Sequence, residues 1–352
     1  MKIPTEPVGS IPRPVYLQEA IKSFAQGQIP EKELAAKTEQ ALKETIQQLE
    51  ATCSPVISDG EQSKPSFVTY PIHGNKQLDS NGVVIPFADG HTRQLPKLTG
   101  GPFRYQNYAS SYVEKAKSLT RLPVKQAVIS TSAISLLYPQ EGIADYSHDQ
   151  FIQDLIHESE ADIRQCLNAG AYNVQIDFTE ARLALKLDPS RQLLQRFIDL
   201  NNQVLDRFTQ AERKKIGVHS CPGGDHDSTH SADISYADLL PYLFQLRAGN
   251  FYLEYAAEKE KKSTLQAIRE FSKNDQRIFL GVTNVLDPHV ETPEEVCALI
   301  MEAAKVIPVD RLGTTDDCGF SPFADDVSTA RETAFAKIKA RVQGTLLAET
   351  KL

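Results

Sequence analysis

The sequence predicts an α/β fold, a single closed (β/α)8 barrel, and three observations support this fold class. Its 352 residues are too many for one small module and suit one large barrel. Short apolar, β-branched segments alternate with amphipathic helical stretches, which is typical of parallel strands joined by helical crossovers. Polar residues gather at the ends of successive strand candidates, as they do at the mouth of a barrel. We therefore expect residues 1–352 to form one barrel domain.

The elements follow one another in a regular order. The strand candidates are Ile3–Ser10, Pro55–Glu61, Val124–Ser130, Tyr172–Phe178, Lys215–Cys221, Asn250–Ala256, Arg277–Thr283 and Leu312–Cys318. The helical stretches are Glu31–Thr52, Asp149–Ala169, Ser190–Phe208, Tyr236–Leu246, Ser263–Ser272, Pro293–Val306 and Ser328–Val342. The exception is the stretch 62–112, rich in Pro, Gly, Asn and Asp, which we interpret as an excursion inserted over the barrel mouth. Within it, Asn81-Gly82 before Val83 predicts a hairpin turn.

Composition limits the partners and the compartment. Apolar residues make up 41% of the chain and charged residues 24%, which is typical of globular proteins. Lys and Arg number 38 and Asp and Glu 46, a net charge of −8, so no nucleic-acid partner is expected. No apolar run approaches the ~18 residues of a membrane helix, and the start of the chain lacks a secretory signal. Five scattered cysteines suit a reducing compartment, so we expect a cytoplasmic protein without a membrane partner.

The polar ends of the strand candidates indicate where chemistry takes place. They are Gly9-Ser10, Asp59-Gly60-Glu61, Ile176-Asp177, His219-Ser220-Cys221, Leu253-Glu254 and Asp316-Asp317-Cys318. Any one of them could be a loop start or a helix cap. Because the carboxyl ends of barrel strands converge at one mouth, the six together predict one site.

Four of these residues have the chemistry of metal ligands. His219 and Cys221 are two residues apart on a strand, so their side chains leave the same face and can chelate one ion. Cys318 closes another strand, although a buried cysteine is more often simply apolar packing. Glu254 ends an apolar strand, where an unpaired carboxylate is costly. One imidazole, two thiolates and one carboxylate form a tetrahedral set that favours zinc.

The charge of this ligand set predicts a type of reaction. Two thiolates and one carboxylate give a zinc centre a formal charge of −1, which makes hydrolysis an unsuitable chemistry. If a substrate thiol replaced Glu254, the total charge would not change, and the metal would hold that thiol deprotonated below its ordinary pKa of about 8.5. The sequence therefore predicts alkyl transfer to a thiol.

Seven short motifs, in this order, are shared with a known family. They are Val8-Gly9-Ser10-Ile11-Pro12, Asp59-Gly60-Glu61, Gln175-Ile176-Asp177, His219-Ser220-Cys221, Leu253-Glu254, Asp287-Pro288-His289 and Asp316-Asp317-Cys318-Gly319. The chain resembles the catalytic C-terminal barrel of the cobalamin-independent methionine synthase family, within the wider group that includes uroporphyrinogen decarboxylase. The resemblance covers nearly the whole chain. It implies a zinc-dependent methyltransferase that makes methionine from homocysteine and 5-methyltetrahydrofolate, polyglutamylated or not, or a related donor.

The resemblance also implies roles for individual residues. The zinc ligands would be His219, Cys221, Glu254 and Cys318. Homocysteine would be bound by Gly9, Ser10, Glu61 and Asp177, with the two carboxylates on its ammonium group. His289 would assist proton transfer at the methyl donor, a role that suits a side chain titrating near neutrality.

Two departures from the family leave the methyl donor open. Folate-using members carry an additional N-terminal barrel, and this chain resembles the short, single-barrel relatives. Those enzymes also stack the pterin on a tryptophan near the third strand, whereas this chain has no Trp and reads Ala127-Val128-Ile129-Ser130-Thr131-Ser132-Ala133 there. The segment 222–235 is also longer than expected, and we interpret it as a polar, solvated loop. Glu180 and Arg182, which follow Asp177, are interpreted as ordinary polar residues at a helix start.

Three alternatives remain open at this point. The acceptor could be another thiol, such as coenzyme M, attacking an epoxide or other alkyl donor. The barrel could bind zinc without catalysis, or it could be a decarboxylase that needs no metal. A homo-oligomer is compatible with each of these readings.

Overall fold

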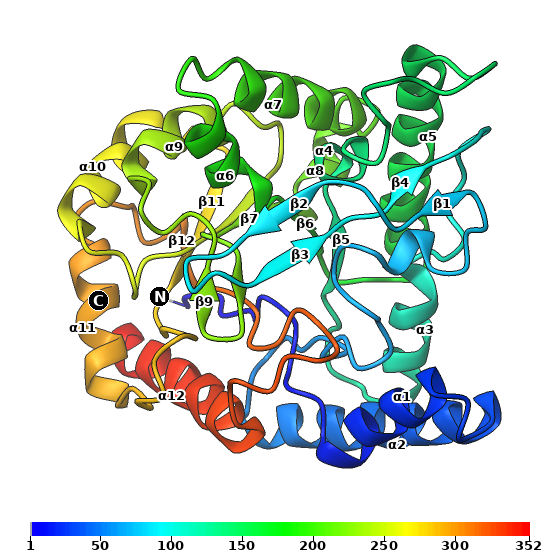
Figure 1. Ribbon diagram of the computed structural model, residues 1–352. Helices are drawn as coiled ribbons and strands as arrows, with labels where there is room; N and C mark the ends of the chain where they lie inside the picture. Colours follow the sequence, from blue (N-terminus) through cyan, green and yellow to red (C-terminus); the bar gives the residue numbers. More distant parts are fainter. Residues whose placement is uncertain (1) are drawn as a thin grey trace.

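Six parallel strands form the main sheet of the protein (Figure 1). The computed structural model describes residues 2–352. The strands, in their spatial order, are β5 (Gln126–Ile129), β6 (Val174–Asp177), β7 (Ile216–Ser220), β10 (Asn250–Leu253), β11 (Arg277–Gly281) and β12 (Leu312–Thr315). Apart from the exposed Arg277 that starts β11, every residue in these strands is buried. This pattern is expected of parallel strands that are covered on both faces.

Two extended segments close the sheet into a barrel. Near the N-terminus, Thr5 forms a parallel bridge with Thr314 of β12, and Ile57 forms one with Val124, just before β5. The two segments also contact each other, because Ser58 Oγ donates to the Gly9 carbonyl at 2.6 Å. The predicted (β/α)8 barrel is therefore confirmed.

The first two predicted strands are held by single bridges rather than by continuous ladders. The segment 3–10 contains Pro4 and Pro7, and the segment 55–61 begins with Pro55. Proline has no N–H group to donate to a neighbouring strand. Both segments therefore occupy strand positions without being regular strands.

Helices wrap the barrel, and each predicted helical stretch corresponds to one of them. The longer helices are α1 (Val15–Ala25), α2 (Glu31–Ala51), α3 (Ser110–Leu119), α5 (His148–Asn168), α6 (Glu180–Leu187), α7 (Gln192–Leu205), α9 (Tyr236–Leu243), α10 (Lys261–Phe271), α11 (Pro293–Ala303) and α12 (Arg331–Glu349). The shorter ones are α4 (Thr131–Ser135), α8 (Gln210–Arg213) and the 3₁₀ helix Tyr70–Ile72. Side-chain caps fix some of the starts. For example, Thr292 and Glu295 form a reciprocal capping box at α11.

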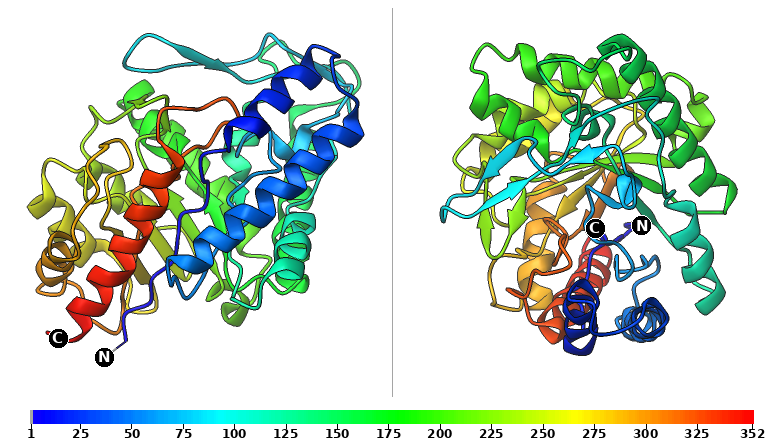
Figure 2. Two further views of the ribbon diagram at one scale, coloured as in Figure 1. Left: turned by 90° about the horizontal axis from the view of Figure 1, so that it is seen from below. Right: turned by 45° about the vertical axis from the view of Figure 1, so that its right-hand side comes forward.

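The predicted excursion contains two small antiparallel pairs. Strand β1 (Leu78–Asp79) pairs with β4 (Lys97–Leu98), and β2 (Val84–Pro86) pairs with β3 (Thr92–Gln94). Both ribbon views show the β2–β3 hairpin crossing one end of the barrel, and the chain termini lie toward the other end (Figure 2). The excursion therefore covers the mouth of the barrel.

The prediction of a hairpin turn at Asn81-Gly82 is wrong. The hairpin turns at residues 87–91, where Gly90 has a φ of +92° and the Phe87 amide donates to the His91 carbonyl at 2.9 Å. Gly82 instead lies against a neighbouring backbone, since an added Cβ there would come within 2.3 Å of the Leu95 carbonyl oxygen. Gly82 permits the close approach of two backbone segments. In the sequence, a glycine with this role looks the same as a glycine that forms a turn.

The expectation of a solvated loop in the segment 222–235 is also wrong. Strands β8 (Gly224–Asp225) and β9 (Ser228–Thr229) form a short hairpin whose four residues are buried or half-buried. The excursion covers this hairpin, because the Ala88 amide donates to the Thr229 carbonyl at 2.9 Å and the Asp89 amide donates to Ser228 Oγ at 3.2 Å. Across residues 2–352, no helix has both the length and the apolar character needed to cross a membrane.

Candidate active site and metal centre

Three of the predicted metal ligands meet at the barrel mouth. Each of His219, Cys221 and Cys318 offers one ligand atom, and the three atoms lie within 4.8 Å of one another. His219 belongs to β7, Cys221 directly follows β7, and Cys318 follows β12. The sulfur atoms of the two cysteines are 3.0 Å apart and are not joined in a disulfide. Barrel closure thus brings together residues that are nearly 100 positions apart.

The imidazole of His219 is oriented to bind a ligand. Its Nδ1 lies 3.1 Å from the Tyr252 carbonyl, while its buried Nε2 has no hydrogen-bond partner. A backbone partner on one ring nitrogen is the usual arrangement for a metal-binding histidine. The hydrogen bond from Cys221 also lowers the pKa of the Cys318 thiol well below its ordinary value. An orphaned imidazole nitrogen beside a thiolate fits a soft, tetrahedral ion such as zinc.

Glu254 lies outside the group of three. It follows β10, and its Oε2 accepts a hydrogen bond from Arg182 Nη1 at 3.1 Å. The same nitrogen donates to Glu258 Oε1 at 2.6 Å. Burial raises the pKa of Glu254 well above its ordinary value, and the nearby charge of Asp317 adds to this effect. Arg182 therefore provides the cation that we expected beside the buried carboxylate of Glu254.

The predicted amino-acid-binding residues line a small cavity beside the candidate ligands. Ser10, Glu61 and Asp177 all line it, together with His219 and Cys318. The carbonyl oxygen of Gly9 accepts a hydrogen bond from Ser58 Oγ, which helps to fix the position of Gly9. Close packing shapes this cavity, because an added Cβ at Gly319 would come within 2.1 Å of Ser10 Oγ. The structure thus brings five of the predicted site residues around one space.

The two carboxylates of this cavity have different surroundings. Glu61 Oε1 forms a buried ion pair with Lys64 Nζ at 2.8 Å. Asp177 has no such cation and accepts a hydrogen bond from Gln175 Nε2 at 2.7 Å. Burial raises the pKa of Asp177 to about 7. Asp177 is therefore the carboxylate that is available to an incoming ammonium group, and Lys64 is a site residue that the sequence analysis missed.

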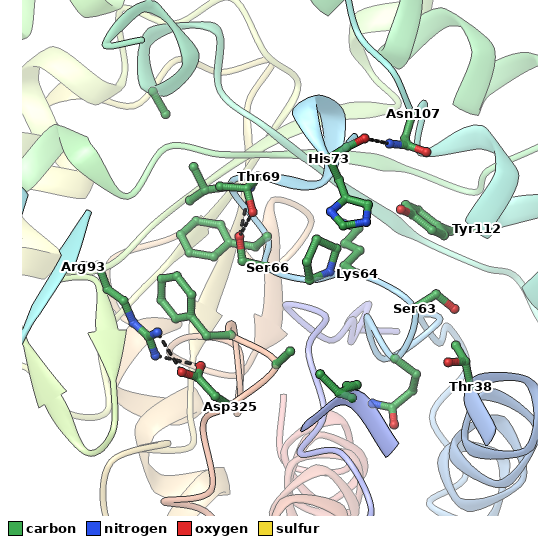
Figure 3. A pocket seen from close by; sticks show the side chains of 18 of the residues that line it. Thr38, Ser63, Lys64, Ser66, Thr69, His73, Arg93, Asn107, Tyr112 and Asp325 are labelled. Carbon is green, nitrogen blue, oxygen red and sulfur yellow. Dashed lines mark hydrogen bonds and ion pairs between the residues drawn. The ribbon is translucent and has the colours of Figure 1, made fainter. Parts of the chain in front are cut away.

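A second, larger cavity of about 1210 Å³ adjoins the first. The two share Phe67, Thr179, Gly223 and Gly224 in their linings. Its walls come from α1 and α2, from the excursion, and from the loops after β7 and β12. Figure 3 shows two sides of this cavity. On one side Arg93 of the excursion pairs with Asp325, and on another side lies Thr38 of α2. The mouth therefore has room for a second, larger reactant.

His289 does not line either cavity. It lies in the loop between β11 and α11, its side chain is 57% exposed, and its Nε2 is 3.2 Å from Glu295 Oε2. Its backbone amide donates to Asp287 Oδ1 at 2.9 Å. A role at the methyl donor therefore requires this loop to move, and it stays a prediction.

Glu180 and Arg182 are more than helix-start residues. They do begin α6, but Glu180 is 6% and Arg182 is 2% exposed. Arg182 reaches Glu254, whereas Glu180 turns toward Ser130 and Ser132. The interpretation of both as ordinary polar residues is wrong, because a helix start at a barrel mouth faces inward. The only sequence signal was their position just after Asp177.

This fold and this site define a class of protein: a (β/α)8 barrel with a thiol-rich candidate metal centre at its mouth. Residues 3–340 match the family model described as "Cobalamin-independent synthase, Catalytic domain". The chain belongs to this family, and the predicted resemblance is confirmed.

Curated relatives of two lengths resemble the chain. The methionine synthase of Sulfurisphaera tokodaii is 21% identical, and the alignment covers 99% of this chain and 94% of that protein. The 5-methyltetrahydropteroyltriglutamate–homocysteine methyltransferase of Photorhabdus laumondii is 24% identical over 90% of this chain, but the match spans only 40% of that enzyme. The chain thus corresponds to nearly all of the first protein and to less than half of the second.

Solved structures share the fold. The B12-independent methionine synthase from Shewanella sp. W3-18-1, solved in complex with selenomethionine, matches with a TM-score of 0.78 at 18% identity, covering 100% of this chain and 99% of that one. A putative vitamin-B12-independent methionine synthase from Listeria monocytogenes matches with a TM-score of 0.71 at 20% identity, covering 98% of each chain.

Proposed function

We propose that residues 1–352 act as one catalytic unit that transfers a methyl group to the thiol of homocysteine and forms methionine. The donor is 5-methyltetrahydrofolate, polyglutamylated or not, or a related methyl carrier. The observation that carries this proposal is the meeting of His219, Cys221 and Cys318 beside a cavity lined by Ser10 and Asp177. Membership of the cobalamin-independent synthase family and the names of the relatives support it.

His219, Cys221 and Cys318 would hold a zinc ion, with Glu254 as a fourth and exchangeable ligand. The ion would act as a Lewis acid that keeps a substrate thiol deprotonated at neutral pH. Because Arg182 pairs with Glu254, this carboxylate would not become an unpaired buried charge if a substrate thiol took its place at the ion. Arg182 would thereby make Glu254 an exchangeable ligand.

The small cavity would hold the amino-acid part of homocysteine. Asp177 is buried there with a pKa raised to about 7, and an incoming ammonium group would favour its ionised form. Glu61 is already neutralised by its ion pair with Lys64. It therefore helps to position Lys64 and attracts the ammonium group less than Asp177 does. Holding the acceptor in a fixed place beside the larger cavity is the main contribution of these residues to rate.

The same features favour homocysteine over a sulfonate thiol such as coenzyme M. Lys64 Nζ donates to Glu61 Oε1 and to the Ala127 carbonyl, so it already has two oxygen partners. A sulfonate in the small cavity would face the carboxylate of Asp177 with no cation free to balance it. An ammonium group would form an attractive pair there.

The test combines zinc-loaded protein with homocysteine and, separately, with coenzyme M. 5-Methyltetrahydrofolate with one or three glutamates, methylcobalamin and S-methylmethionine are then supplied in parallel. Methionine formed from homocysteine and at least one donor is the expected result. Bound zinc whose coordination responds to no thiol would instead support a non-catalytic zinc-binding barrel. Asp177→Asn removes a charged partner of the ammonium group and is expected to raise the KM for homocysteine about tenfold or more.

A further inference from the structure

The β8–β9 hairpin carries a histidine to which the proposed function gives no role. His230 directly follows β9, is 6% exposed, and lines the large cavity. Its backbone amide donates to the Gly223 carbonyl at 3.2 Å, and Gly223 lines both cavities. The hairpin therefore places an imidazole ring at the border between the proposed place of homocysteine and the large cavity.

The Nε2 edge of this ring lies against Gly223. A Cβ added to Gly223 would come within 1.8 Å of His230 Nε2. Phe87, which also lines the large cavity, packs against the ring with the two centroids 5.5 Å apart. His230 Nε2 has no hydrogen-bond partner, and unlike the free nitrogen of His219 it is not completely enclosed. This atom is therefore available to a molecule in the large cavity.

The neighbouring serine determines which ring nitrogen carries the hydrogen. Ser231 Oγ donates its own hydrogen to the Pro222 carbonyl at 3.0 Å. The same oxygen lies 2.9 Å from His230 Nδ1, so it accepts a hydrogen bond from Nδ1–H. A neutral imidazole has only one N–H group. Nε2 consequently carries a lone pair and acts as a hydrogen-bond acceptor.

The surroundings keep the ring neutral. Burial lowers the pKa of His230 to about 4, the positive charges of Lys186 and Arg182 add to this effect, and Asp233 opposes it. At neutral pH the ring therefore has no N–H to offer at Nε2. The same two cations disfavour a positively charged partner at this position.

Side chains of α6 hold the segment that carries the ring. Lys186 Nζ donates to the His230 carbonyl at 3.0 Å, and Arg182 Nε donates to the Ile234 carbonyl at 2.7 Å. The ring is thus fixed before a reactant arrives, and a partner of Nε2 would be held in a defined place.

We propose that His230 binds the methyl donor, with Nε2 accepting a hydrogen bond from an uncharged N–H group near the reacting end of that molecule. This inference rests on the proposed function. A donor in the large cavity has to bring its methyl group past Gly223 to reach the substrate sulfur. An anionic group there would face the lone pair of Nε2, and an ammonium group would face the nearby cations. Ser231 is a positioning residue, because it keeps the hydrogen on Nδ1.

The test separates the KM for the donor from the KM for homocysteine. 5-Methyltetrahydrofolate and methylcobalamin, which both contain uncharged N–H groups, are supplied separately. His230→Phe keeps a ring of similar size but cannot accept a hydrogen bond, so an N–H of the donor would be left unpaired. The KM for the donor that the wild-type protein uses should rise about fivefold or more. The KM for homocysteine should change less than about twofold.

His230→Gln provides the conservative variant. Glutamine can place a carbonyl oxygen near the position of Nε2, so the KM for the donor should return to within about threefold of the wild-type value. An unchanged donor KM in His230→Phe, or an equal rise of both KM values, would overturn the inference. So would turnover with S-methylmethionine alone, because the only nitrogen of that donor is an ammonium group.

Nitrogen-15 NMR gives a readout that packing alone would not change. In the wild-type protein at neutral pH, Nδ1 of His230 should carry the hydrogen, and binding of the donor without homocysteine should shift the Nε2 signal. Ser231→Ala removes the partner of Nδ1, so part of the protein should carry the hydrogen on Nε2 and the KM for the donor should rise. A hydrogen on Nε2 in the free wild-type protein would contradict the proposal.

A histidine of the same hairpin provides the matched control. His226 is partly exposed and lines neither cavity, so His226→Phe should leave both KM values unchanged. A rise of the donor KM as large as that in His230→Phe would show that any disturbance of the hairpin has this effect, and would overturn the inference. Methionine formed from no donor would overturn the proposed function and this inference with it. Turnover with a donor KM that does not depend on His230 would overturn this inference alone.

Discussion

Arg182 Nη1 lies 3.1 Å from Glu254 Oε2, and both side chains are buried. Glu254 directly follows strand β10, whereas Arg182 belongs to α6, the helix after the strand that contains Asp177. Arg182 thus neutralises Glu254, the carboxylate that we propose as an exchangeable ligand of the metal ion.

Replacing Arg182 with Met should destabilise the metal-free protein more than the zinc-loaded one. Without zinc, the change leaves Glu254 and Glu258 as unpaired buried carboxylates, which costs about 3–5 kcal/mol. With zinc, the ion offers Glu254 another cation, so the loss should be at least ~1 kcal/mol smaller. Urea unfolding with and without zinc measures both losses. Lys186→Met, which breaks an exposed pair on the same helix, is the control. Equal losses in the two states would show that Glu254 is not a ligand.

Replacing Cys318 with Ser should abolish tight zinc binding, thiol binding and turnover while leaving the fold largely intact. Serine is nearly the same size but offers zinc a much poorer ligand than a thiolate. Bound zinc, measured after dialysis, should fall from one equivalent per chain to well below half (roughly tenfold or more weaker binding). Cys53→Ser changes an exposed cysteine outside the site and should retain zinc. Full activity in Cys318→Ser would refute the metal assignment.

Replacing Arg93 with Ala should release the excursion from the barrel mouth. Arg93 Nη2 donates to Asp225 Oδ1 at 3.0 Å and to Asp325 Oδ1 at 2.9 Å, and so joins the excursion to the β8–β9 hairpin and to the loop after β12. Loss of charged hydrogen bonds of this kind costs about 3 kcal/mol, which corresponds to roughly 100-fold faster hydrogen exchange where local opening controls it. The Ala88 amide, which is bonded to the Thr229 carbonyl, reports this opening.

An exposed ion pair of the same excursion provides the comparison for Arg93. Lys97 Nζ is 2.8 Å from Glu141 Oε1, and this pair lies at the surface. Exposed pairs are worth about 0–1 kcal/mol, so Lys97→Ala should change exchange of the Ala88 amide only slightly. Similar exchange rates in the two variants would show that Arg93 does not hold the excursion in place.

Lys125 should make the stability of the protein rise with pH. It is buried, its Nζ donates to the Pro7 carbonyl at 2.7 Å, and burial lowers its pKa from 10.5 to about 7. In the unfolded chain the pKa returns to its ordinary value, so between these two pH values the unfolded state binds more protons than the folded state. The free energy of unfolding should therefore increase with pH across this range, by up to about 2–3 kcal/mol between pH 7 and 9.

Lys125→Met should remove this increase, as measured by urea unfolding at pH 7 and pH 9. Methionine fills a similar volume and carries no titrating group. The exposed Lys97→Met serves as the control and should leave the pH dependence unchanged. If the wild-type protein and Lys125→Met show the same pH dependence, Lys125 is charged in the folded protein at pH 9.

The fold and the candidate metal ligands could be predicted from the sequence because their signals lie within short stretches of the chain. The spacing of His219 and Cys221 on one strand, and the polar residue at the end of each strand, depend only on neighbouring residues. The carboxyl ends of barrel strands converge at one mouth. Once eight such segments are recognised, the meeting of His219 and Cys221 with Cys318 is therefore expected. The same reasoning fails for Gly82, because a glycine needed for close packing and a glycine needed for a turn look alike in sequence.

The sequence by itself therefore determined the barrel, its excursion, and which side chains end its strands. Only the tertiary structure decided how distant side chains are paired: Arg182 with Glu254, and Glu180 with two serines that precede it by about fifty residues. Local patterns fix polarity and periodicity, because these depend on short stretches of backbone. Pairing of buried charges depends on which distant segments the closed barrel brings within hydrogen-bonding distance, and no short stretch of sequence contains that information.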